Sequence, residues 1–88
     1  MQFDSILWDR NDDPLGNVQH IAKHNLTTNE VENALNKPLG RDISRSSGLP
    51  VVFGNTGTGR HIMVVYKVID ASTVRPITAF DVPKRKRT

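Results

Sequence analysis

The first half of the chain spaces its apolar residues as helices do, at intervals of three and four. The apolar residues of the two segments are Val18, Ile21 and Ala22, then Val31, Ala34 and Leu35. The first helix is predicted to begin near Asn17 and to end before Asn25, a residue that tolerates the left-handed conformation after a helix. The second is predicted to begin at Thr27, which forms a capping-box pattern with Glu30, and to end before Pro38.

The second half alternates apolar and polar residues and is rich in β-branched side chains, which indicates strands. The predicted strands are 41–46, 51–53, 60–70 and 74–80, and a short edge strand is predicted within 1–9. Turn residues at 55–59 and 70–73 favour an antiparallel meander. The predicted fold class is therefore α+β, with the order strand, two helices and four strands, and with both helices packed on one face of a mainly antiparallel twisted sheet.

Length and composition limit the chain to one small domain, because it has 88 residues, of which 36% are hydrophobic. We expect a single domain over 1–83 and a basic C-terminal tail over 84–88. The sequence has no cysteine, which excludes disulfides and thiolate-bound metals. No apolar run approaches the roughly 20 residues that cross a bilayer, and the N-terminus lacks a signal pattern. A cytoplasmic protein is expected.

The net charge of +3 is unevenly distributed along the chain. Residues 1–44 hold four basic and seven acidic side chains, a net −3, whereas residues 45–88 hold eight and two, a net +6. The terminal run Lys84-Arg85-Lys86-Arg87 supplies four of the basic groups, and it either solubilises the chain or follows a phosphate backbone. An anionic partner is expected at the C-terminal half. The run has no aromatic residues interleaved with it, so the sequence does not predict a stacking platform for bases.

The three histidines are the first candidates for a general acid or base, since only their side chains titrate near neutral pH unperturbed. His20 and His24 are four apart, so a helix puts both imidazoles on one face. This spacing also occurs in zinc-binding pairs, but the sequence shows no third ligand. The simpler alternative is that both rings line a solvated helix face.

The long predicted strand over 60–70 places alternate residues on opposite faces of the sheet. One face carries Arg60, Ile62, Val64 and Tyr66, and the other carries His61, Met63, Val65 and Lys67. Arg75 joins either face, depending on the strand register. The glycine-rich segment 54–59 resembles a phosphate-binding loop, but no helix and no Lys-Ser/Thr pair follow it, so a hairpin turn is expected.

Several short motifs together resemble the BrnT-type toxins, which belong to the RelE-like superfamily of type II toxin–antitoxin ribonucleases. The motifs are Ile6-Leu7-Trp8-Asp9, the Lys23-His24 pair that ends the first helix, the second helix from Thr28, Gly59-Arg60 before a Val-Val-Tyr strand, and Ile77-Thr78-Ala79. The resemblance covers most of the chain from Leu7 to Ala79. It implies the RelE/BrnT-like fold, cleavage of RNA without a metal or other cofactor, inhibition of translation and growth, and neutralisation by a cognate antitoxin protein.

The resemblance also implies roles for individual residues. His24 is the candidate base or acid, while Arg60 and Tyr66 match the family's basic and aromatic strand positions; Arg75 completes the candidate catalytic set. The candidate RNA-binding residues are Lys23, Lys67, Lys84, Arg85, Lys86 and Arg87. The RNA is expected to be mRNA, free or on the ribosome, and the oligomeric state is expected to be set by the antitoxin complex.

Three departures from the family pattern bear on this function. Asn25 replaces a glycine, the segment between Asp9 and His24 is more acidic, and Phe80 stands where a basic residue is expected. The last departure leaves fewer basic side chains to stabilise the phosphate during cleavage. The leading hypothesis is an endoribonuclease toxin, and the alternative is a non-catalytic module of the same fold that binds protein or nucleic acid.

Overall fold

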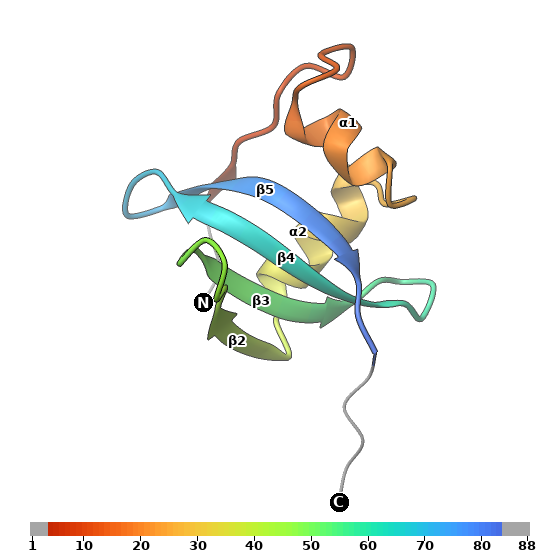
Figure 1. The fold of residues 1–88 in the computed structure, drawn as a ribbon, viewed down its shortest axis with the longest axis vertical. Coiled ribbons are helices and arrows are strands. Elements are labelled where there is room, and N and C mark those ends of the chain that lie inside the picture. Colours follow the sequence, from red (N-terminus) through yellow and green to blue (C-terminus); the bar gives the residue numbers. More distant parts are fainter. Residues whose placement is uncertain (1–3, 84–88) are drawn as a thin grey trace, which may run out of the picture.

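A computed structural model of the chain describes residues 4–83 and contains two helices and a five-stranded sheet (Figure 1). The helices are α1 (Asn17–Ala22) and α2 (Thr28–Asn36); the strands are β1 (Ser5–Ile6), β2 (Gly40–Ile43), β3 (Pro50–Asn55), β4 (His61–Val68) and β5 (Thr73–Asp81). The predicted α+β class and element order are confirmed. Neither helix of the described range has the length and apolarity needed to cross a membrane.

The strand order is β1-β5-β4-β3-β2, and the antiparallel pairing from β2 to β5 is the predicted meander. β1 instead pairs parallel with β5, with Ser5 opposite Thr73. The first strand is therefore next to the last, which the local sequence pattern did not indicate. A register shift between Val65 and Tyr66 interrupts the pairing of β4 with β5.

Two predicted strands are longer than the observed ones, because turns end them early. β4 stops at Val68, since the amides of Ile69 and Asp70 both donate to the Thr73 carbonyl, at 2.9 and 3.3 Å, and close the turn. β2 stops at Ile43, before a turn in which the Gly48 amide donates to the Ser44 carbonyl at 2.8 Å.

The sequence predicted the start of α2 and the left-handed Asn25 correctly, whereas α1 ends at Ala22 and leaves His24 in the turn after the helix. The hydroxyl of Thr27 accepts from the Glu30 amide at 3.3 Å, while the Glu30 carboxylate accepts from the Thr27 amide at 3.0 Å, so the capping box is complete. Asn25 adopts the left-handed conformation with φ of 59°.

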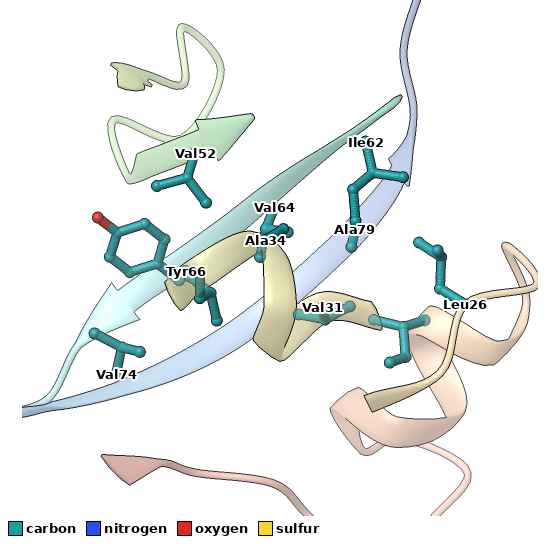
Figure 2. Close-up of a cluster of buried hydrophobic side chains, with 11 residues drawn as sticks. Leu26, Val31, Ala34, Val52, Ile62, Val64, Tyr66, Val74 and Ala79 are labelled. Carbon is teal, nitrogen blue, oxygen red and sulfur yellow. The ribbon is translucent and has the colours of Figure 1, made fainter. Parts of the chain in front are cut away.

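The core lies between the two helices and one face of the sheet (Figure 2). Buried residues of this cluster are Ile21, Leu26, Val31, Ala34, Leu35, Val52, Ile62, Val64, Tyr66, Val74 and Ala79. On β4 the face that carries Ile62, Val64 and Tyr66 points into the core, a choice that the sequence pattern had left open. α2 lies very close to β3, because a Cβ built on Gly54 would be 2.7 Å from the Cβ of Ala34.

Candidate functional site

α1 ends in a turn, Lys23–Asn25, which we call the His24 turn. The amides of His24 and Asn25 donate to carbonyls in the last turn of α1 at 2.9 and 3.0 Å. These bonds satisfy carbonyls at the helix end and let the chain reverse. The side chains of Lys23 and His24 are both exposed, so the turn presents a cation and an imidazole to solvent.

The guanidinium of Arg60 fastens the His24 turn to the sheet. Its Nη2 donates to the His24 carbonyl at 2.8 Å, and its Nη1 donates to the Asn25 carbonyl. The same group forms a two-point ion pair with Asp81, with Nε to Oδ1 and Nη2 to Oδ2 both at 2.8 Å. These hydrogen bonds raise the pKa of Arg60 and lower the pKa of Asp81. Arg60 therefore has a carboxylate and two carbonyls as partners.

Two imidazoles and a phenyl ring lie beside one another at this turn. The ring centroids of His20 and His24 are 6.1 Å apart, as their spacing on the predicted helix suggested. The centroids of His24 and Phe80 are 6.0 Å apart. His20 and His24 are exposed and Phe80 is half-buried. An aromatic ring from β5 thus borders His24, at the position where a basic residue was expected from the sequence resemblance.

The remaining predicted catalytic residues lie at the other end of β4 and β5. Tyr66 is opposite Pro76 and Lys67 is opposite Arg75 in the strand register. Tyr66 lies about 20 Å along the strand from Arg60, at about 3.3 Å per residue. Its side chain is 6% exposed and belongs to the core cluster. The structure therefore brings Lys23, His24 and Arg60 together, but not Tyr66, Lys67 or Arg75 with them.

Arg75 shares the face of Lys67 and is held by an ion pair. Its Nη2 is 2.6 Å from Oδ2 of Asp9, and both side chains are partly buried. The same Asp9 oxygen accepts the backbone amide of Asn17 at 2.8 Å. Lys67, in contrast, is exposed. The carboxylate of Asp9 thus connects the start of α1 with β5.

The side chain of Asn17 completes this connection and is only 3% exposed. Its Nδ2 donates to the carbonyls of Leu7 and Pro76 at 3.0 and 2.9 Å, and its Oδ1 accepts the Asp9 amide at 2.8 Å. One amide group therefore joins the segment after β1, the first residue of α1 and β5. It fixes where α1 begins, and Arg60 fixes where the helix ends.

Sequence reasoning missed Asp81, the carboxylate that orients Arg60, and the contact of Phe80 with His24. Both contacts depend on how β5 pairs with β4, and local sequence patterns do not specify that pairing. The predicted RNA-binding residues Lys84, Arg85, Lys86 and Arg87 lie outside the described residues.

Neither a metal centre nor a phosphate loop is indicated by the described part of the chain. Within residues 4–83, no group of three or more His, Asp or Glu side chains is arranged to hold a metal ion. The glycine-rich segment forms the predicted hairpin between β3 and β4. In that hairpin the hydroxyl of Thr56, rather than a ligand, accepts the amides of Thr58 and Arg60 at 3.3 and 3.1 Å.

Comparison of the chain with protein-family models, curated proteins and solved structures finds no match.

Proposed function

We propose that this protein is a metal-independent endoribonuclease that acts as the toxin of a type II toxin–antitoxin system. The observation that carries the proposal is the pair of exposed imidazoles, His20 on α1 and His24 on the anchored turn after it, with centroids 6.1 Å apart. The resemblance of the sequence to BrnT-type toxins supports the same function.

Cleavage of RNA by its own 2′-hydroxyl needs a base, an acid and positive charge. The base removes the 2′-hydroxyl proton, the 2′-oxygen attacks the adjacent phosphorus, and the 5′-oxygen leaves with a proton from the acid. His24 takes one of these roles and His20 the other, which adds His20 to the residues expected from the sequence. Lys23 supplies positive charge beside them. The products are a 2′,3′-cyclic phosphate and a 5′-hydroxyl.

Arg60 contributes to this site by positioning His24 rather than by binding phosphate. Its donors already meet Asp81 and two carbonyls of the His24 turn. A side chain with these partners holds the backbone of the turn in one geometry, which is what a fixed acid or base requires.

A cognate antitoxin is proposed as the protein partner, covering the site while the toxin is silent. Because the C-terminal half has a net charge of +6, an acidic or amphipathic segment of the antitoxin is expected to bind there. Its affinity should fall as the salt concentration rises.

A non-catalytic binding module of the same fold is the second candidate function. The observation that favours it is that Arg60 and Arg75 both form ion pairs, with Asp81 and Asp9, and that Phe80 borders His24. A protein of this kind binds RNA or protein through its basic half without cleaving anything.

The decisive experiment incubates purified protein with end-labelled RNA in a chelator, and in parallel with the same oligonucleotide carrying 2′-deoxyribose throughout. Cleavage of the RNA alone, with cyclic phosphate ends, is expected. His24→Ala and His20→Ala should each reduce the cleavage rate by about a hundredfold or more while retaining affinity.

Lys37→Ala is the matched control, since Lys37 is exposed at the end of α2, away from the histidines. It should cleave like the wild type. Induction of the wild type in a bacterial host should arrest growth, and His24→Ala should relieve the arrest. Uncut RNA with a folded wild-type protein would sink the nuclease proposal and favour the binding module.

A further inference from the structure

The face of the sheet opposite the helices carries a row of half-buried apolar side chains across three strands. Phe53 on β3 is opposite Met63 on β4, and Met63 is opposite Phe80 on β5. Side chains at paired positions point to the same face, and these three are not members of the core cluster. In Figure 1, α2 crosses behind β4, so the viewer looks onto the face opposite the helices.

A second aromatic ring adjoins one end of the row. The rings of Phe53 and His61 are nearly parallel, with an interplanar angle of 10° and centroids 6.3 Å apart. Nδ1 of His61 is 3.0 Å from Oδ1 of Asn55, which fixes the imidazole orientation. Both rings are half-buried rather than covered. We call these two rings, together with the half-buried ring of Phe80, the ring platform.

Among the described residues, an exposed basic side chain lies at one end of this face. Lys67 is exposed at one end, opposite Arg75. At the other end the Val82 amide donates to the His61 carbonyl at 2.9 Å, which holds the end of β5 beside His61. Flat rings and a cation on one face suit a ligand that has both flat groups and negative charges. Single-stranded nucleic acid has this chemistry.

We propose that the ring platform binds single-stranded RNA by stacking its bases on Phe53, His61 and Phe80, while Lys67 meets a phosphate farther along the same face. The choice of RNA rests on the proposed function. Phe80 also borders His24, with ring centroids 6.0 Å apart. A base stacked on Phe80 therefore brings the neighbouring phosphate toward the imidazoles, so Phe80 replaces a charge contact by a stacking contact.

The test measures binding by fluorescence anisotropy, with a labelled single-stranded DNA oligonucleotide of mixed sequence as the probe. DNA lacks the 2′-hydroxyl, so binding is measured whether or not the protein cleaves RNA. Phe53→Leu and Phe80→Leu keep the apolar packing but remove the π surface. Each should weaken binding by at least about fivefold, and a duplex of the same sequence should bind more weakly than the single strand, because its bases are already stacked.

Leu15→Ala is the control, since this side chain is 93% exposed and distant in sequence from the platform. It should leave the affinity unchanged. Wild-type affinity in both leucine variants, with the fold verified by circular dichroism, would overturn the proposal. Equal binding of the duplex and the single strand would also overturn it. So would competition by polyglutamate that disappears in the leucine variants, since that result would indicate an acidic protein partner.

The outcome is separable from that of the proposed function. Binding that depends on the rings, in a protein that leaves RNA uncut, would support the platform and overturn the nuclease. RNA cleavage that depends on His24, with unchanged affinity in both leucine variants, would support the nuclease and overturn the platform.

Discussion

A single buried amide, that of Asn17, holds together three segments that are distant in the sequence. Its hydrogen bonds satisfy the backbone amide of Asp9 and the backbone carbonyls of Leu7 and Pro76 at the same time. Because the residue is 3% exposed, water does not readily replace these bonds. Asn17 therefore sets the origin of the helix that carries His20 and leads into the His24 turn, and through them it supports the proposed function.

Replacement of Asn17 by alanine is expected to destabilise the fold by about 2–4 kcal/mol, since it leaves the Asp9 amide and the carbonyls of Leu7 and Pro76 without their partner. Urea unfolding would measure the loss. Asn29→Ala, at an exposed position on α2, should change the free energy of unfolding by no more than about 0.5 kcal/mol. Equal effects of the two substitutions would contradict the structural role of Asn17.

The ion pair of Asp81 with Arg60 predicts a particular dependence of stability on pH. Hydrogen bonds from Arg60 lower the pKa of Asp81 in the folded state. The pair therefore stabilises the fold at pH above the ordinary carboxyl value of about 3.9, and this contribution is lost as the pH falls through the lowered pKa.

Asp81→Asn should lower the thermal midpoint at pH 7, and the difference from the wild type should shrink as the pH falls through the lowered pKa of Asp81. Thermal denaturation followed by circular dichroism over this range would show it. Asp4→Asn, which removes an exposed carboxylate near β1, is the control. A constant difference between Asp81→Asn and the wild type at every pH would show that the ion pair is not its source.

At the scale of elements, the closest approach is that of α2 to β3, and a glycine makes it possible. A Cβ on Gly54 would lie 2.7 Å from the Cβ and 2.9 Å from the Cα of Ala34. The backbone of a helix yields less readily than a flexible side chain, so an added methyl group must push the two elements apart.

Gly54→Ala is accordingly expected to cost about 1–3 kcal/mol of stability. Gly57→Ala is the matched control, because nothing lies within 4 Å of a Cβ at that position, and it should change stability by about 0.5 kcal/mol or less. Chemical denaturation of both variants would compare them. A neutral Gly54→Ala would mean that α2 is free to move away from β3.

Elements with strong local signals were predictable from the sequence, and their relative placement was not. The capping box at Thr27 and the left-handed Asn25 are determined by nearby residues, so both were predicted correctly. The parallel pairing of β1 with β5 and the shift after Val65 depend on contacts between distant segments.

The same distinction explains the candidate site. The four-residue spacing of His20 and His24 predicted that their rings lie together, and they do, although α1 ends at Ala22 and His24 lies in the turn after it. The sequence could not decide which face of the sheet carries Arg75, because that depends on the strand register, which shifts between Val65 and Tyr66. The ring platform was not expected, since Phe53, His61 and Phe80 are scattered in the sequence and become neighbours only through strand pairing.

At the scale of the whole molecule, the charge asymmetry predicts how binding responds to salt. Each phosphate contact on a single strand adds about 0.7 to the slope of log affinity against log salt concentration. A protein ending at Pro83 lacks the four basic residues of the terminal run. Its slope for single-stranded RNA is therefore expected to be smaller by up to about 3.

Anisotropy titrations at several salt concentrations, in a His24→Ala background that prevents cleavage, would measure this slope. Lys37→Ala in the full chain should retain the full slope, since it removes one charge from the acidic half. An unchanged slope after truncation would mean that the terminal run does not contact phosphate.

The contacts that fix α1 also determine when, during synthesis, the protein becomes able to act. Asn17 bonds to Pro76 and Asp9 pairs with Arg75, across separations of 59 and 66 residues. Contacts this distant form slowly and only after the later segment has been made. The histidines therefore leave the ribosome long before β5, which holds them in place. A ribosome translating this message is exposed to the finished site only after Asp81 has emerged, so the order of the strands delays the onset of the proposed toxicity.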